Sequence, residues 1–506
     1  MITLTKIVPD QQSSYRQILR ATSLFGAVQV FNIIISIIRS KFVAVLLGPT
    51  GMGIMGLLTS TIGMISRLTN FGLGTSAVKD IASALGTGKE KRIGIIITVI
   101  RRFVWITGLM GLIITAVLSH WLSQITFGSS EYSLAFIWLS ISLLFDQLSS
   151  GQLVILQGLR QLNYLAKANL SGSFIGLFIS IPLYYIWDLD GIVPGIIGSA
   201  LFSLLMSWYF AKKTKFIKTP LSVAQTLVEG KNMLQVGFMI SLSGFFSVAA
   251  SYIVRIYISR IGGVDQVGLY TAGFAIINTY VGLIFNAMGT DYYPRLSAVA
   301  HDNSICKQTI NQQAEIAILI LAPILIVFLI VIQWVVILLY SRQFIAVNEM
   351  INWAALGMFF KAASWAVAFM FLAKGSGKLF FWNELMANAY LLAFNILGYH
   401  FWGLTGLGIS FAIGYLVYLI QVYVISKIKF AFNFDSDFVK IFSIQLCLVL
   451  VVFLTINFLN IPYAYQAGTL LAIISGWYSI AELEKKMGLL SILRRYRDKI
   501  DSNFNI

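Results

Sequence analysis

The chain has 506 residues, of which 58% are hydrophobic and only 11% are charged, and its formal net charge is +16. This composition, with 41 glycines, is typical of a bundle of membrane helices, in which small residues let helices approach closely. The positive charge is explained by membrane topology, because cytoplasmic Lys and Arg meet anionic headgroups. We therefore expect the lipid bilayer as a partner and no nucleic acid.

Segments of about 20 apolar residues recur along the chain, and each is long enough to cross a bilayer core of about 30 Å as a helix. Only short connections separate them, so we expect no domain on the outer side of the membrane. We predict an all-α polytopic membrane protein with about fourteen transmembrane helices, at residues 22–46, 53–78, 95–119, 133–156, 168–187, 191–211, 236–258, 264–289, 313–339, 350–373, 382–400, 404–426, 441–459 and 463–481.

The connections between these segments differ sharply in charge. Of the 36 Lys and Arg residues, 27 lie in the two tails and in every second connection, whereas the opposite connections hold only Arg260 and Arg342. Positive charge near helix ends marks the cytoplasmic side. The pattern predicts a multi-pass protein of the inner membrane with both termini in the cytoplasm.

A shift of 215 residues superimposes segments 1–6 on segments 7–12 and brings Gly48 onto Gly263 and Gly53 onto Gly268. With an even number of spans in each half, the halves would be parallel repeats, here two six-helix lobes around a central cavity. We predict an N-terminal lobe at 1–211, a cytoplasmic linker at 212–235, a C-terminal lobe at 236–427, two extra helices at 441–481 and a basic tail at 482–506. The tail is either an interfacial helix or a solvated segment.

Polar residues recur at helical spacing in four of the predicted segments, which are partners in the repeat. Ionisable groups in hydrocarbon are costly and usually face a cavity, so Arg39, Arg67 and Arg255 are candidates for function. The same faces carry further polar residues that we expect to line the cavity: Asn32, Ser36, Asn70, Ser247, Ser251, Asn278 and Asn286. Helix packing is the alternative for the small residues, and snorkelling is the alternative for Arg39 and Arg255.

Asp146 and Lys361 lie near the middle of segments 4 and 10, and the 215-residue shift superimposes them. Together they could form a gate-like salt bridge. Alternatively, Asp146 could carry a coupling proton or cation, or balance a nearby arginine.

Signatures of soluble-enzyme chemistry are missing from the sequence. The three histidines are scattered without metal-ligand spacing, and no glycine-rich phosphate loop precedes a Lys-Ser or Lys-Thr pair. We expect no enzyme activity, no metal site, no cofactor and no direct use of ATP.

Two stretches resemble the first helices of bacterial polysaccharide flippases: RSKFVAVLLGPTGMG at 39–53 and FGLGTSAVKD at 71–80. These flippases are the O-antigen translocase group of the multidrug/oligosaccharidyl-lipid/polysaccharide exporter superfamily. The resemblance implies transport of an undecaprenyl-pyrophosphate-linked oligosaccharide, an O-antigen-like repeat unit, from the cytoplasmic to the periplasmic leaflet by alternating access. It places the protein in lipopolysaccharide biosynthesis at the bacterial inner membrane.

The same resemblance suggests roles for particular parts of the chain. Cationic side chains on cavity helices would hold the pyrophosphate, here Arg39, Arg67, Arg255 and Lys361, and the last two helices would hold the lipid tail. We expect a monomer, with glycan polymerisation machinery as a further partner.

Two other functions stay open. A drug/cation antiporter of the same superfamily would need acidic cavity residues, for which the chain offers mainly Asp146. A membrane polysaccharide polymerase or ligase would be expected to have a large outer loop or an acidic catalytic cluster.

Overall fold

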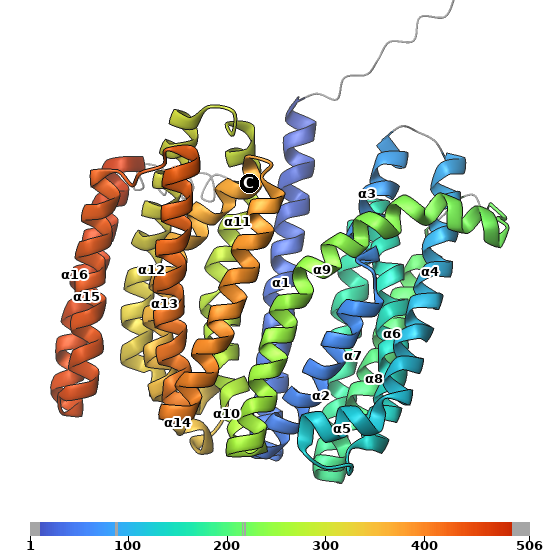
Figure 1. The fold of residues 1–506 in the computed structure, drawn as a ribbon, viewed down its shortest axis with the longest axis horizontal. Coiled ribbons are helices and arrows are strands. Elements are labelled where there is room, and N and C mark those ends of the chain that lie inside the picture. Colours follow the sequence, from blue (N-terminus) through green and yellow to red (C-terminus); the bar gives the residue numbers. More distant parts are fainter. Residues whose placement is uncertain (1–10, 87–89, 215, 217–218, 488–506) are drawn as a thin grey trace, which may run out of the picture. The chain divides into compact units, whose positions relative to one another are not determined.

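A computed structural model describes residues 11–86, 90–214, 216 and 219–487, and all regular structure within them is helical (Figure 1). The chain packs as two compact units, Met1–Gly268 (unit 1) and Leu269–Ile506 (unit 2), and each is described by itself. Residues 488–506, most of the predicted basic tail, lie outside the described residues.

Unit 1 is built from helices that pack both on sequence neighbours, as α7 does on α8, and on helices further along the chain, as α4 and α8 do on α6. Its core is formed by α3, α4, α6 and α9, where side chains such as Ile81, Ile97 and Ile155 are fully buried. Its elements are α1 (Gln11–Leu46), α2 (Gly48–Thr69), α3 (Leu73–Gly86), α4 (Glu90–Val117), α5 (Ser119–Phe127), α6 (Ser133–Gly158), α7 (Leu162–Trp187), the short turn η1 (Asp188–Gly191), α8 (Ile192–Lys212), α9 (Val223–Gly262) and the start of α10 (Val264–Ala275).

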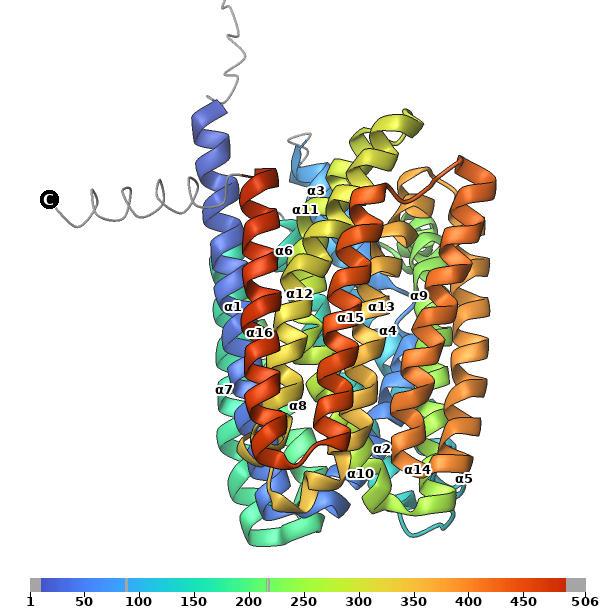
Figure 2. The same cartoon turned by 90° about the vertical axis from the view of Figure 1, so that its left-hand side faces the viewer.

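Unit 2 has α12 and α13 at its centre, with fully buried side chains such as Leu325 and Phe359. Figure 2 shows α15 and α16 side by side, next to α12. The elements of unit 2 after α10 are the π-helical turn η2 (Ile276–Val281), α11 (Leu283–Ala298), α12 (Asn303–Leu339), the turn η3 (Arg342–Val347), α13 (Asn348–Ala373), α14 (Gly377–Phe430), α15 (Ser436–Phe458) and α16 (Ile461–Met487).

Eight helical stretches among the described residues are long and apolar enough to cross a membrane, or nine if a bent pair within α9 is counted as one span. Two of the eight, Leu162–Lys212 with 51 residues and Gly377–Phe430 with 54, far exceed the roughly 20 residues that one crossing needs. Each is a hairpin of two helices. The all-helical polytopic fold is thus confirmed, and the count of fourteen stays a prediction with which these stretches are compatible.

The two hairpins turn with the same backbone geometry. Asp188 follows α7 with φ 49° and ψ −126°, and Gly403 within α14 has φ 56° and ψ −137°. These positions are 215 residues apart. In the first hairpin a Cβ on Gly191 would clash with the carbonyl of Leu183, and in the second a Cβ on Gly406 would clash with that of Gly398. The repeat seen in the sequence therefore recurs in the backbone.

The start of α10 meets the start of α2 in a reciprocal contact within unit 1. A Cβ on Gly53 would clash with the Val264 carbonyl, and one on Gly268 with the Pro49 carbonyl. The 215-residue shift brings Pro49 onto Val264 and Gly53 onto Gly268. The two contacts are therefore equivalent, with the two helices in exchanged roles. Thr50 Oγ1 donates to Asp265 Oδ1 at 2.6 Å, and these two residues are also 215 apart.

Helix α9 begins earlier than the sequence pattern predicts. The expected linker covers 212–235, whereas α9 starts at Val223 and packs in unit 1. A capping box explains the early start: Ser222 Oγ accepts from the Gln225 backbone N–H at 3.1 Å, and Gln225 Oε1 accepts from that of Ser222 at 2.9 Å. Figure 1 shows this first part of α9 crossing the ends of α3 and α4. The compact units consequently divide after Gly268, later than the predicted halves.

Candidate functional site

The end of α2 crosses α9 at very short range. Asn70 caps α2, and its Oδ1 accepts from the Gly72 backbone N–H at 3.0 Å and from Ser241 Oγ of α9 at 2.8 Å. Gly72 has φ +59°, and a Cβ at this position would clash with the Gly237 carbonyl. The contact needs glycine both in the turn after α2, at Gly72, and on α9, at Gly237, and it fixes the predicted polar residue Asn70 against α9.

Arg67 lies one turn before Asn70, on the same face of α2. Its side chain is exposed, and a Cβ built on Gly244 of α9 would lie 3.7 Å from its Nη1. The guanidinium thus lies beside α9 near Ser247, whose side chain is also exposed. A guanidinium presents a planar set of donors that match phosphate oxygens.

Further along α9, Arg255 donates through Nη1 to the hydroxyl and the carbonyl of Ser251, one turn before it. Ser247, Ser251 and Arg255 follow one another at intervals of four residues and form the predicted stripe. Because this arginine is half-buried and bonded to its own helix, it sits within the span rather than extending away from the helix.

Helix α1 carries three of the predicted residues and packs on α7. Ser36 is exposed, whereas Asn32 Oδ1 and Arg39 Nε are buried and have no hydrogen-bond partner. A buried polar atom left without a partner costs roughly 1–3 kcal/mol. Such atoms commonly await a ligand or an ordered water, which fits the predicted role of α1 in substrate binding.

The structure places Arg39, Arg67 and Arg255 in one compact unit, on three helices of which α2 contacts both of the others. Asn278 is in unit 2, exposed within the π-helical turn, a feature that often accompanies functional sites. The side chain of Asn286 lies outside the described residues.

Asp146 of α6 opens onto a small polar pocket in unit 1. The pocket has a volume of about 260 Å³, and its polar lining comes from three helices, α6, α7 and α8: Asp146, Ser149, Ser150, Asn169, Ser173 and Ser203. A carboxylate surrounded by hydroxyl and amide groups can hold a proton or a small cation.

Lys361 of α13 faces aromatic rings of α14 in unit 2. Its Nζ lies 5.0 Å from the ring centre of Tyr415 and 5.7 Å from that of Phe411. Cation–π attraction offsets part of the cost of an ammonium group in the membrane. This lysine therefore has stabilising contacts within its own unit while it keeps its charge.

A carboxylate that the sequence analysis overlooked lies next to this cluster. Glu384 Oε1 accepts hydrogen bonds from the Tyr418 hydroxyl and, at 3.2 Å, from Asn383 Nδ2. Gln421 Nε2 in turn donates to Asn383 Oδ1 at 2.8 Å. Glu384 is close to the start of the predicted segment 382–400. Its acidic character inside an apolar run was the available signal.

The 215-residue shift relates the polar residues around Asp146 in unit 1 to those around Lys361 and Glu384 in unit 2. It superimposes Asp146 on Lys361, Asn169 on Glu384 and Ser203 on Tyr418. Each unit therefore carries a polar cluster at the same place in its fold, with different charges. The gate-like ion pair between Asp146 and Lys361 stays a prediction. Among the described residues, no group of His, Cys, Asp and Glu is arranged to hold a metal ion.

Comparison with known proteins identifies the family of the chain and several proteins with a similar sequence or fold. A family model described as "Polysaccharide biosynthesis protein" matches residues 18–300. A Shigella flexneri protein described as "Putative O-antigen transporter" is 26% identical over 400 residues, which cover 77% of this chain and 93% of that protein.

Solved structures with a similar fold include the lipid II flippase MurJ in an inward closed conformation, with a TM-score of 0.67 and 15% identity over 93% of this chain and 99% of that one. An inward-facing multidrug resistance transporter of the MATE family in the MOP superfamily has a TM-score of 0.65 and 17% identity over 79% and 94%. These likenesses confirm the expected fold, and the relatives agree with the expectation of a transporter rather than an enzyme.

Proposed function

Because the chain belongs to the polysaccharide biosynthesis protein family, we propose that it is a flippase for a lipid-linked oligosaccharide. The Shigella relative, described as a transporter of O-antigen, supports this substrate class. In its finer form, the proposal is that the cargo is an undecaprenyl-pyrophosphate-linked repeat unit. It would move from the cytoplasmic to the periplasmic leaflet of the inner membrane by alternating access.

One observation carries most of the proposal, namely the exposed guanidinium of Arg67 in the last turn of α2, beside Gly244 of α9. A pyrophosphate cannot cross hydrocarbon without compensation, because burying an unpaired charge costs many kcal/mol. Arg67 supplies a fork of donors for phosphate oxygens, and Arg39 and Arg255 add positive charge on neighbouring helices. The exposed hydroxyls of Ser36 and Ser247 suit a sugar rich in hydroxyl groups.

Other parts of the molecule take supporting roles in this proposal. The α15–α16 hairpin would accept the polyprenyl tail, and the Asp146 pocket would carry a coupling proton or cation. We propose that the protein acts as a monomer and delivers its cargo to glycan polymerisation machinery.

The test compares lipid-linked oligosaccharides in host cells that lack the gene and in cells that carry it again as wild type, Arg67→Ala or Lys91→Ala. Lys91 is the matched control, since it is an exposed cation at the start of α4. Removing a charge-assisted contact worth roughly 1.5–3 kcal/mol should slow transport about tenfold or more. We expect completed repeat units to accumulate in the deletion strain and with Arg67→Ala, and to clear with wild type and Lys91→Ala.

If deletion leaves surface glycan intact and no repeat unit accumulates, the flippase proposal is wrong. Resistance to cationic drugs would then be measured, because an acidic pocket such as the one at Asp146 would favour an antiporter. If deletion causes accumulation and Arg67→Ala is as active as wild type, the function stands but Arg67 is not part of the path.

A further inference from the structure

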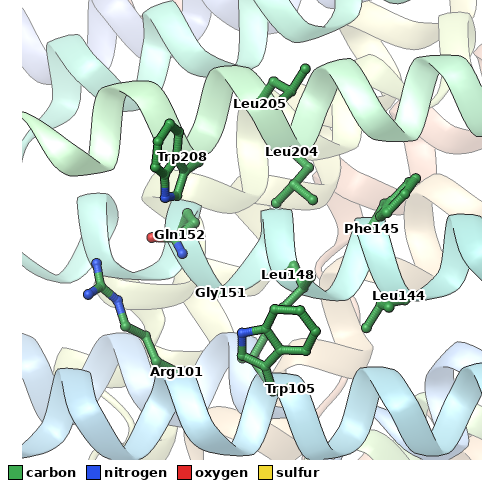
Figure 3. Close-up of a pocket in the computed structure, with 11 residues that line it drawn as sticks. Arg101, Trp105, Leu144, Phe145, Leu148, Gly151, Gln152, Leu204, Leu205 and Trp208 are labelled. Atoms are coloured by element: carbon green, nitrogen blue, oxygen red, sulfur yellow. The ribbon is translucent and has the colours of Figure 1, made fainter.

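A groove of about 560 Å³ runs between α4, α6 and α8 on the surface of unit 1 (Figure 3). Its floor is one face of α6, including Leu144, Leu148 and Gly151, and its walls come from α4 and α8. Gly151 keeps the floor close to α4, because a Cβ there would lie 2.8 Å from Val104 Cγ2. The groove is thus a built feature of three packed helices.

The polar groups of this groove gather at one end. Figure 3 shows Arg101, Gln152 and Trp208 at that end, whereas Leu144 and Phe145 lie at the other. The polar end belongs to the basic side of the unit, because Trp208 precedes the end of α8 by one turn and Lys212 Nζ lies 5.2 Å from its ring centre. Tryptophan and cationic residues in such a position mark the headgroup level of a bilayer.

Arg101 also borders a second groove, of about 350 Å³, on the other side of Trp105. The second groove lies between α4 and the start of α9, with Ile106, Val223 and Leu227 in its walls. Arg101 and Trp105 line both grooves, so they form a ridge between two apolar channels. Trp105 is 51% exposed, as is Trp208, although both belong to apolar spans.

The two neighbouring arginines of α4 have different surroundings. Arg102 donates to the carbonyls of Leu221 and Ser222 and to the hydroxyl of Thr226, and so holds the start of α9. Arg101 instead stacks on Phe216 at 5.2 Å, and its Nε is buried without a hydrogen-bond partner. Arg102 is a structural residue, whereas Arg101 keeps donors available for a ligand.

We propose that Arg101 binds the phosphate of an anionic diacyl phospholipid whose two acyl chains occupy the two grooves. The guanidinium would contact the phosphate, with the Gln152 amide and the Trp208 indole N–H at the same end of the larger groove. Leu148 and Leu204 would pack on one chain, and Ile106 and Leu227 on the other. The site uses only the first turns of α9 and none of the residues of the predicted transport path on α1, α2 and α9.

The lining favours this occupant over the transport substrate. Arg102 also borders the second groove, but its donors are taken up by the start of α9, so Arg101 is the arginine left to meet a phosphate. A single guanidinium matches a phosphodiester, whereas a pyrophosphate calls for several positive groups. Among the residues that line the larger groove, only Arg101, Gln152 and the indole N–H groups of Trp105 and Trp208 can form side-chain hydrogen bonds, so a sugar would find few partners. Two channels on either side of one cation also fit a lipid with two chains better than a single polyprenyl chain.

The proposal is tested with the delipidated full-length protein in detergent, by native mass spectrometry with phosphatidylglycerol, phosphatidylcholine or polyprenyl phosphate. Three variants are compared: Arg101→Gln, Leu205→Trp, which fills the larger groove without changing charge, and Lys91→Gln, the control that loses one charge from the same helix. We expect phosphatidylglycerol to bind more tightly than phosphatidylcholine. Its affinity should fall about tenfold in Arg101→Gln and Leu205→Trp and stay unchanged in Lys91→Gln.

Unchanged phosphatidylglycerol binding in both groove variants would overturn the proposal. A larger Arg101-dependent loss for polyprenyl phosphate than for phosphatidylglycerol would also overturn it, because the site would then serve the single-chain lipid. Thermal unfolding of each lipid-free variant shows whether the fold is retained. If only one of the two groove variants folds, that variant alone is enough to test the proposal. The readout is lipid binding, so the result does not depend on the proposed transport function.

Discussion

Glu384 illustrates how a single ionisable residue can be held inside a span. Its carboxylate accepts from Tyr418 and Asn383, and the Asn383 amide is fixed by Gln421. Replacing Tyr418 with phenylalanine removes one donor and leaves the carboxylate less well satisfied. We expect the free energy of unfolding to fall by about 1–3 kcal/mol, measured by thermal unfolding in detergent. Tyr463→Phe is the control, because Tyr463 is 65% exposed.

A Tyr418→Phe protein as stable as wild type would mean that this hydrogen bond contributes no net stability. The substitution Glu384→Gln tests whether the carboxylate serves stability or transport. A glutamine carbonyl can still accept from Tyr418, so this variant should unfold near the wild-type temperature. Loss of transport at an equal protein level would assign a role to the negative charge itself.

At the residue scale, the sequence predicted the kind of side chain better than its partners. Arg67 is exposed in the last turn of α2, and Ser247 and Ser251 lie one turn apart on α9, while their roles stay predictions. The bond from Ser241 to Asn70 joins residues 171 positions apart, and the contact of Gly72 with Gly237 depends on how two helices cross. Helical periodicity describes one element and carries no information on such crossings.

Among the elements, the two repeat hairpins store different amounts of backbone strain. Asp188 and Gly403 adopt nearly the same positive-φ conformation, which suits glycine and costs other residues roughly 1–3 kcal/mol. We expect Asp188→Gly to raise the free energy of unfolding by about 1 kcal/mol, since the residue is exposed. Gly403→Ala should lower it by a similar or larger amount, and both are measured by thermal unfolding.

Asp190→Gly is the matched control for this pair, because Asp190 is in the same turn but does not have a positive φ. It should be neutral or destabilising, since glycine is more flexible in the unfolded chain. If Asp188→Gly and Asp190→Gly lower stability equally, positive φ is not a source of strain in this turn.

The same elements show why some boundaries were predictable. Gly48 and Gly263 match in the repeat and both have positive φ, 63° and 83°, at the breaks before α2 and α10. Asp188 and Gly403 share a conformation without sharing a residue type, so no sequence match revealed them. The start of α9 was missed because its first turns are polar, although the Ser222–Gln225 capping box is a local signal for a helix start.

For the whole molecule, the charge asymmetry of the connections makes a prediction about topology. Lys and Arg gather on one side, which should be cytoplasmic, because positively charged connections are retained there during insertion. The composition and the periodic apolar segments were sufficient for the all-helical membrane fold. They could not give the packing of α9 in unit 1, since that depends on the contacts of Arg102 and the capping of Ser222.

Cysteine labelling in intact cells measures this topology. Cys306 and Cys447 are first replaced by serine, and one cysteine is then placed at Ser130, between α5 and α6, or at Asn433, between α14 and α15. Both sites are exposed, so a difference in labelling reports sidedness rather than burial. We expect a membrane-impermeant maleimide to label Ser130→Cys in intact cells and to label Asn433→Cys only after the cells are opened. The reverse pattern would place the basic connections outside the cell. The proposed direction of transport would then lose its topological support, because the pyrophosphate would be loaded from the wrong side.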